Sequence, residues 1–253
     1  MPTKTLATTT PWTAALALLA LFAPTPAAAA DSARLARVDA YLRAFFEKSP
    51  VPGMSVVVVE GDQVVLARGY GVEQAGQPRS MTASSSVGIG SLGKSFTALA
   101  VMQLVEQGVV QLDDPLVKHV PWFRTADADA SQRITLRMLL SNSSGLPSQD
   151  ADLLNDVDTS DQALERGVRA LQRYQLRRTP GESFEYSNEG WDALAVLLQE
   201  KTGQPYGQLI DQRILQPLGM NRSTARIDRL PALTALDGHW PAIDGVHPAL
   251  PIY

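Results

Sequence analysis

Apolar positions in the first part of the chain follow two different spacings. In residues 31–48 they recur every three or four positions, which predicts an amphipathic helix, with Leu35, Val38, Leu42 and Phe45 on one face. Two β-branched runs follow at 54–59 and 64–67, separated by turn-forming residues at 60–63. This pattern predicts a β-hairpin, and the polar, aperiodic stretch 74–86 predicts a loop.

The middle of the chain has helical periodicity. Residues 91–107 are apolar on nearly every side, which predicts a buried helix, and Gly108 is a candidate C-terminal cap. Further helices are predicted at 135–141, 161–175, 189–201 and 205–216. Beyond these, Pro241, Pro248 and Pro251 predict an irregular tail without further strands.

These elements predict an α/β (α+β) fold, in which a helical lobe packs on an antiparallel sheet. Only the N-terminal hairpin of that sheet is expected in this chain, with the C-terminal strands missing. A two-stranded hairpin alone is marginally stable in water. The chain is therefore expected to be truncated at its C-terminus.

The first thirty residues have the pattern of a secretory signal peptide. Lys4 precedes an apolar run at 12–22, and the small residues Ala27–Ala30 form a candidate cleavage site. The apolar run is too short for a transmembrane helix. We expect residues 1–30 to be removed and residues 31–253 to form one secreted or periplasmic domain without a membrane span.

Composition excludes several classes of partner and site. Without residues 1–30, 21 Lys and Arg stand against 26 Asp and Glu, so nothing indicates a nucleic-acid partner. Cysteine is absent, and His119, His239 and His247 lack the spacing of metal ligands. We expect no metal and no cofactor, and we interpret His239 and His247 as loop residues.

The segment Gly88–Ser95, GIGSLGKS, matches three motifs. Two of them, the phosphate loop and the dinucleotide loop, require a buried strand directly before the glycines. Residues 81–86 are mostly polar, so both interpretations fail in this context, and export is a second objection to a nucleotide partner. The third motif is Ser91-x-x-Lys94.

Ser91 and Lys94 have the spacing of a nucleophile and its base. Residues three apart share a helix face, so the Lys94 amine can contact the Ser91 hydroxyl and accept its proton. A helix buried on all sides would lower the pKa of such a lysine. The Ser91 amide, at the helix N-terminus, could also donate to an oxyanion. The motif alone is weak evidence for a nucleophile, because a serine that only caps a helix N-terminus gives the same pattern.

The run 87–100 resembles the active-site helix of serine β-lactamases and penicillin-binding proteins. Later segments resemble successive motifs of the class C β-lactamase, D-alanyl-D-alanine carboxypeptidase and esterase branch, in the same order: Leu112–Pro115, Leu139–Pro147, Pro180–Gly181 and Tyr186–Asn188. The resemblance covers residues 33–253. It implies a β-lactamase/transpeptidase-like fold, Tyr186 as a catalytic tyrosine and Asn188 as a substrate-binding asparagine.

By this resemblance Tyr186 shares the proton of Ser91 and later activates the deacylating water, while Asn188 donates to a substrate carbonyl and fixes Lys94. The literal Lys201-Thr202-Gly203 matches the third motif of the superfamily. A helix between Asn188 and Lys201 would separate them by roughly 20 Å, so we reject this match and interpret Gly203 as a helix cap.

The sequence thus predicts an exported serine hydrolase that acts on β-lactams, D-alanyl peptides or simple esters through an ester on Ser91. Small molecules or peptides are the expected substrates. Because the chain is expected to be incomplete, it is also expected to be nearly inactive as written. The alternative is a catalytically silent member of the same fold that binds peptidoglycan or a protein.

Overall fold

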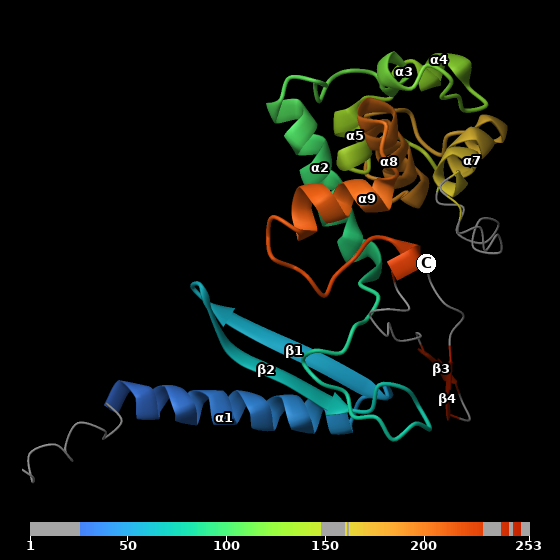
Figure 1. The fold of residues 1–253 in the computed structure, drawn as a ribbon. Coiled ribbons are helices and arrows are strands. Elements are labelled where there is room, and N and C mark those ends of the chain that lie inside the picture. The colour runs from blue at the N-terminus through green and yellow to red at the C-terminus, as the bar shows by residue number, and fades with distance from the viewer. Residues whose placement is uncertain (1–25, 148–159, 161, 230–238, 243–244, 249–253) are drawn as a thin grey trace, which may run out of the picture. The chain divides into compact units, whose positions relative to one another are not determined.

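The computed structural model describes residues 26–147, 160, 162–229, 239–242 and 245–248 of the 253-residue chain. They belong to two compact units (Figure 1). One unit comprises residues up to 73 together with 77–83, and the other comprises 74–76 together with the chain from 84 onward. The elements are helices and antiparallel strand pairs, which confirms the predicted α+β class.

The first unit combines a helix with a β-hairpin, as predicted. Its elements are α1 (Pro26–Glu47), β1 (Gly53–Glu60) and β2 (Gln63–Gly71). The strands pair antiparallel, from Gly53 opposite Gly71 to Glu60 opposite Gln63. Helix α1 begins earlier than the sequence pattern predicts. The predicted signal segment lies mostly outside the described residues, so the predicted domain bounds stay a prediction.

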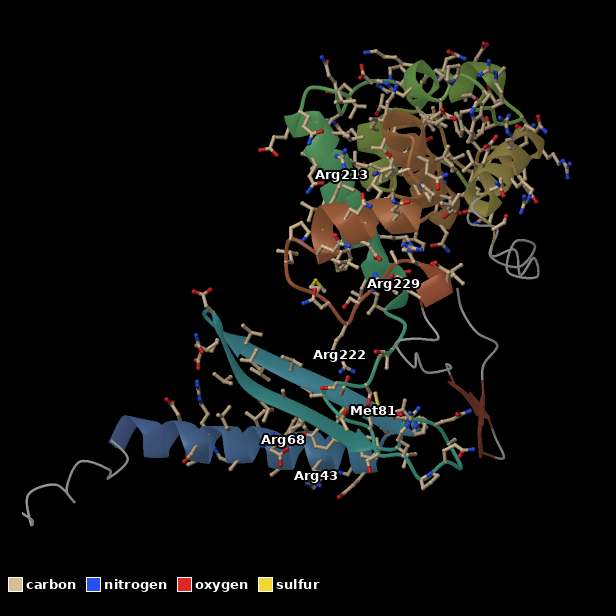
Figure 2. All side chains as sticks on the ribbon, in the orientation of Figure 1. Arg43, Arg68, Met81, Arg213, Arg222 and Arg229 are labelled. Atoms are coloured by element: carbon tan, nitrogen blue, oxygen red, sulfur yellow. The ribbon has the colours of Figure 1, made fainter. Side chains whose placement is uncertain are left out.

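Helix α1 contacts β2 through an aromatic stack and a shared carboxylate. Phe46 stacks on the buried Tyr70, with ring centroids 6.2 Å apart. The Tyr70 hydroxyl donates to Asp39 Oδ1 at 2.7 Å, and Arg43 and Arg68 lie within 4.0 Å of the same carboxylate (Figure 2). This hydrogen bond satisfies the polar end of Tyr70, so its ring can be buried without leaving a hydroxyl unpaired.

The second unit is mainly helical. Its elements are η1 (Gly90–Gly93), α2 (Lys94–Glu106), α3 (Leu116–His119), α4 (Ala128–Ser131), α5 (Leu136–Leu140), α7 (Ala163–Ala170), η2 (Leu171–Arg173), α8 (Asn188–Thr202), α9 (Tyr206–Ile210), η3 (Asp211–Leu215) and η4 (Ile227–Arg229). The helices predicted at 135–141, 161–175, 189–201 and 205–216 are confirmed. Helices α3 and α4 are a single turn each, too short to give a periodic pattern. Within the described ranges, no helix is long and apolar enough to cross a membrane.

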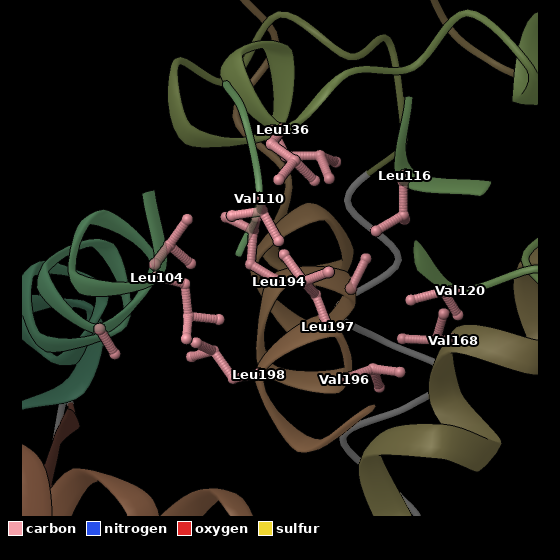
Figure 3. Packing of buried hydrophobic residues seen from close by; sticks show 14 of the residues in the cluster. Leu104, Val110, Leu116, Val120, Leu136, Val168, Leu194, Val196, Leu197 and Leu198 are labelled. Carbon is pink, nitrogen blue, oxygen red and sulfur yellow. The ribbon is translucent and has the colours of Figure 1, made fainter. Parts of the chain in front are cut away.

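Helix α8 lies at the centre of the apolar core of this unit. Its Leu194, Leu197 and Leu198 are fully buried, between Leu104 of α2 and Val168 of α7 (Figure 3). Burial of a leucine side chain contributes roughly 2 kcal/mol. The core therefore fixes α2 and α8 against each other, and both helices carry predicted site residues.

Helix α2 is buried on only one side, so the prediction of burial all round is wrong. Ala100 and Val101 are fully buried, whereas Leu99 is 45% exposed and Met102 is 43% exposed. The buried side faces α8 and α9. An apolar sequence shows that a helix can be buried on every face, but neighbouring elements decide which faces are covered.

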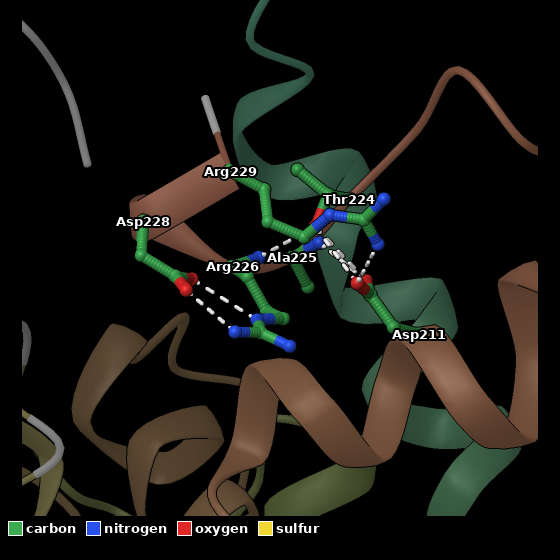
Figure 4. A network of polar contacts seen from close by, with 6 residues as sticks. All are labelled: Asp211, Thr224, Ala225, Arg226, Asp228 and Arg229. Atoms are coloured by element: carbon green, nitrogen blue, oxygen red, sulfur yellow. Dashed lines mark hydrogen bonds and ion pairs between the residues drawn. The ribbon is translucent and has the colours of Figure 1, made fainter. Parts of the chain in front are cut away.

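A buried aspartate at the start of η3 attaches the segment after η3 to that helix. Asp211, 3% exposed, accepts hydrogen bonds from the Thr224 hydroxyl at 2.9 Å and from the Ala225 amide at 2.9 Å (Figure 4). Arg229 Nη1 lies 3.3 Å from the same carboxylate. Arg222 in this segment donates to the carbonyl of Ser84 at 2.6 Å. The chain after η3 is thus bonded both to η3, through Asp211, and to the segment that leads into η1, through Ser84.

The structure corrects the prediction of an irregular, strand-free tail. Strands β3 (His239–Ala242) and β4 (Gly245–Pro248) form a second antiparallel hairpin, with Trp240 opposite His247. His239 and His247 are therefore strand residues and not loop residues. Proline is compatible with a strand position whose nitrogen points away from the partner strand. Pro241 and Pro248 therefore did not exclude a two-stranded hairpin.

Gly145 and Gly203 both adopt positive φ, but only Gly145 is also enclosed. A Cβ on Gly145 would lie 2.1 Å from the Arg178 carbonyl oxygen, whereas nothing lies within 4 Å of a Cβ on Gly203. We expect Gly203→Ala to reduce the free energy of unfolding by about 1 kcal/mol and Gly145→Ala to reduce it by at least about 3 kcal/mol. Urea denaturation measures both, and equal losses would contradict the close approach at Gly145.

Candidate active site

Ser91 lies on a 3-10 turn, not on the α-helix where the sequence pattern placed it. The turn η1 spans Gly90–Gly93, and α2 begins at Lys94. Gly90 has a φ of 51°, a value that glycine adopts without strain. Ser91 is exposed, and Lys94 Nζ donates to its Oγ at 3.2 Å. The three-residue spacing therefore brings the two groups together in a tighter turn than expected.

Tyr186 and Asn188 contact this pair from a later part of the chain, at the start of α8. The Tyr186 hydroxyl shares a hydrogen bond of 2.8 Å with Ser91 Oγ across 95 residues of sequence. Lys94 Nζ donates to Asn188 Oδ1 at 2.7 Å and lies 5.0 Å from the centroid of the Tyr186 ring. All four residues singled out in the sequence are thus in one hydrogen-bonded group, while their catalytic roles stay a prediction.

Asn142 positions the segment that carries Tyr186. This residue has a φ of 52°, and its carbonyl accepts from the Glu185 amide at 2.7 Å. Its side-chain Oδ1 accepts from the Trp191 indole at 3.0 Å and lies 3.5 Å from the Ser187 amide. The motif Leu139–Pro147, noticed in the sequence only as a resemblance, therefore has a structural role, because it orients residues on both sides of Tyr186.

Ser187 starts helix α8 between the two site residues. Its Oγ accepts from the Gly190 amide at 3.1 Å, as an N-cap does, and lies 2.9 Å from the Pro147 carbonyl. Ser187 is 1% exposed, so its neighbours Tyr186 and Asn188 are attached to a fixed point. Asn188 is the first residue of α8, which explains how its side chain reaches back to Lys94.

The other sequence matches do not contribute to this group. Lys201 lies in the last turn of α8, whose first residue is Asn188, and Gly203 caps that helix with a φ of 65°. The rejection of Lys201 and the interpretation of Gly203 are confirmed. Turns and bends lead into η1 instead of the strand that a phosphate loop requires. In the ranges that the structure describes, no cluster of three metal-ligating side chains occurs.

Sequence reasoning missed two acids on α8. Glu189 is 2% exposed, and its Oε2 lies 3.2 Å from Ser187 Oγ. Asp192 follows Asn188 by four residues and therefore lies on the same face of α8. Burial, and then the charge of Glu189, raise the pKa of Asp192 to about 7, and the Lys94 charge opposes this rise. The four-residue spacing from Asn188 was the signal that could have identified Asp192.

Most of the chain is similar in sequence to known proteins. The Beta-lactamase family model matches residues 38–250. Protein flp of Staphylococcus aureus strain MW2 is 33% identical over 188 residues, which is 74% of this chain and 38% of the relative. The D-alanyl-D-alanine-carboxypeptidase/endopeptidase AmpH of Escherichia coli K12 is 34% identical over 188 residues, 74% of this chain and 49% of the relative.

The fold is also similar to that of solved structures. The octameric penicillin-binding protein homologue from Pyrococcus abyssi superposes with a TM-score of 0.71 at 29% identity, over 85% of this chain and 50% of that one. The chain spans less than half the length of either curated relative named above. On the family match and the fold together, the chain belongs to the beta-lactamase family of the penicillin-binding-protein superfamily.

Proposed function

We propose that this chain carries the nucleophile of an exported serine hydrolase, which transfers acyl groups through an ester on Ser91. One observation supports this most directly. Ser91 Oγ lies within hydrogen-bonding distance of both Lys94 Nζ, at 3.2 Å, and the Tyr186 hydroxyl, at 2.8 Å. An exposed serine that is hydrogen-bonded to an amine and to a phenol, two groups that can exchange protons, has the arrangement of a nucleophile that can be activated.

Acylation follows from these contacts. Lys94 takes the Ser91 proton as Oγ forms a bond to the carbonyl carbon of the substrate. The bond to the leaving group then breaks, and the proton passes through Tyr186 to the leaving group. The Ser91 amide, in the first helical turn, is the candidate donor to the oxyanion. Asn188 keeps Lys94 in place through its Oδ1, and its amide nitrogen remains as a donor to the substrate.

Deacylation reverses these steps with water. Tyr186 is the candidate base for the water, because its hydroxyl already contacts the serine oxygen that becomes the ester. The water oxygen bonds to the acyl carbon, the ester bond to Oγ breaks, and Ser91 recovers a proton. A phenylalanine at 186 would retain the ring contact with Lys94 but would lack the group that moves the proton.

Acyl compounds with a polarised carbonyl are the proposed substrates: β-lactams, D-alanyl peptides or simple esters. The name of the relative AmpH gives carboxypeptidase and endopeptidase activity for that protein, and this supports peptide substrates here. We also propose that residues 1–30 direct export to the periplasm or the medium, where D-alanyl peptides of the cell wall are found.

Covalent labelling tests the nucleophile. We expect the full-length protein to form a one-to-one adduct with a fluorophosphonate, with loss of fluoride, on the peptide that contains Ser91. A penicillin should label the same peptide only if β-lactams are substrates, so the two reagents together distinguish β-lactams from other acyl substrates. Intact-mass and peptide mass spectrometry measure the adducts.

Ser91→Ala should abolish labelling, and Ser95→Ala, which changes an exposed serine four residues later in α2, should not. A folded native protein that neither reagent labels would contradict the proposal and favour a silent protein that binds peptidoglycan or another protein.

Tyr186→Phe tests the proton-transfer step. Loss of general acid–base catalysis should slow turnover of a chromogenic ester by about 10²- to 10⁴-fold. If Tyr186 activates the deacylating water, the acyl-enzyme should also persist long enough to be seen by intact mass. Unchanged turnover would exclude Tyr186 from proton transfer.

A further inference from the structure

A surface cavity of the helical unit is lined mainly by charged and polar side chains, and none of the four hydrogen-bonded site residues lines it. Its volume is about 340 Å³, near the lower end of the range for small-molecule sites. Arg133 lines it from the segment after α4, and Arg177 and Arg178 line it from the segment after η2. Two segments that are distant in the sequence therefore bring three guanidinium groups to one cavity.

The two carboxylates that line the cavity already accept hydrogen bonds from backbone amides. Asp127 Oδ1 accepts from the Ala130 amide at 2.8 Å and caps α4, and Glu182 Oε2 accepts from the Thr179 amide at 3.2 Å. Across the described part of the chain, neither carboxylate forms an ion pair with an arginine of the cavity. These acids therefore leave the donors of the arginines unused.

The arginines of the cavity are exposed, and two of them retain most of their hydrogen-bond donors. Within the described ranges, Arg133 has no side-chain hydrogen bond or ion pair. Arg178 Nε lies 3.9 Å from Glu185 Oε2, which is beyond hydrogen-bonding distance, whereas Arg177 Nη1 lies 3.3 Å from Oε1 of the same carboxylate. A guanidinium has five N–H donors, so those of Arg133 and Arg178 are available to a ligand.

The backbone on both sides of the cavity is fixed by other contacts. Ser131 is fully buried, and its Oγ donates to the Asp127 carbonyl at 2.7 Å. On the opposite side, the Arg177 amide donates to the Gly145 carbonyl at 2.8 Å, and the Arg178 carbonyl packs closely against Gly145. A ligand would therefore order side chains and not loops, which lowers the entropic cost of binding.

We propose that this cavity is a phosphate-binding site, in which Arg133 and Arg178 donate to the terminal oxygens of a phosphate monoester, with Arg177 beside them. One guanidinium pairs with two oxygens at once, so a single arginine already matches a carboxylate. A phosphate monoester has three terminal oxygens and nearly two negative charges at pH 7. Three arginines in one cavity therefore fit a phosphate better than a carboxylate. The inference does not depend on the proposed function, because it requires no chemistry at Ser91.

Calorimetric titration of the native full-length protein with glycerol 3-phosphate tests the site. We expect one equivalent to bind with a Kd below about 1 mM, and acetate to bind at least about tenfold more weakly. Arg133→Gln and Arg178→Gln should each weaken binding about tenfold or more, because each removes a charge-assisted hydrogen bond. Both side chains are exposed, so neither change should shift the melting temperature by more than about 2 °C.

Arg173→Gln is the matched control. Arg173 is an exposed arginine of η2 in the same unit, but it does not line the cavity. Its replacement removes the same charge and should weaken binding less than about threefold in 0.15 M salt, which screens charges outside the site. A loss as large as that of Arg133→Gln, or acetate binding as tight as that of glycerol 3-phosphate, would overturn the inference. A native protein that binds no glycerol 3-phosphate would also overturn it.

Vesicles distinguish two sources of the phosphate. Phosphatidic acid in phosphatidylcholine vesicles presents the same monoester on a surface, and co-sedimentation measures binding of the full-length protein to them. Sedimentation that needs phosphatidic acid and is reversed by glycerol 3-phosphate would support the site and identify a lipid headgroup as its ligand. Binding of glycerol 3-phosphate without sedimentation would support the site and identify a soluble phosphate ester.

Discussion

The hydrogen bond from Lys94 Nζ to Asn188 Oδ1, 2.7 Å long, is the contact on which the geometry of the site depends. A lysine has a long, flexible side chain, and its nitrogen stays in one place only if an acceptor fixes it. Asn188 provides that acceptor from a different helix. With Nζ fixed there, the same nitrogen lies 3.2 Å from Ser91 Oγ, and the serine lies 2.8 Å from the Tyr186 hydroxyl.

This contact joins two helices whose packing does not depend on it. Leu104 of α2 and Leu198 of α8 belong to the same buried core, so the helices approach each other for apolar reasons. The polar ends of both helices lie where this core ends, and there Lys94 meets Asn188. Stability and chemistry are thus separated along the same pair of helices. A change in the site should leave most of the core intact.

The contacts of Asn142 and Ser187 constrain the position of Tyr186. Asn142 accepts from the Trp191 indole and, through its carbonyl, from the Glu185 amide, while Ser187 caps α8. Tyr186 therefore lies between two fixed neighbours. The close approach of Gly145 to Arg178 belongs to the same set of contacts. Backbone hydrogen bonds of this kind place a side chain more accurately than a free loop would.

The N-terminal part of α8, which begins with Asn188, also contains two acids, Glu189 and Asp192. Glu189 is in the first turn of α8, where a negative charge is favoured by the helix dipole, and it is nearly fully buried. Asp192 lies one turn after Asn188 and is forced by burial and by Glu189 toward its neutral form. Glu189 is also attached to the N-cap of this helix, because its Oε2 accepts from Ser187 Oγ at 3.2 Å.

The sequence by itself determined the local features. Helical spacing placed Lys94 beside Ser91, turn residues between β-branched runs gave the first hairpin, and the length of α8 excluded Lys201, because each depends on residues close in the chain. Tyr186 and Asn188 were identified through resemblance to a family, not from spacing. Only the tertiary structure decided that Tyr186 meets Ser91, that α2 is covered on one side and that a second hairpin forms. Such contacts depend on how elements that are distant in the sequence pack together. The hydrophobic periodicity of one segment does not show which other segments lie beside it.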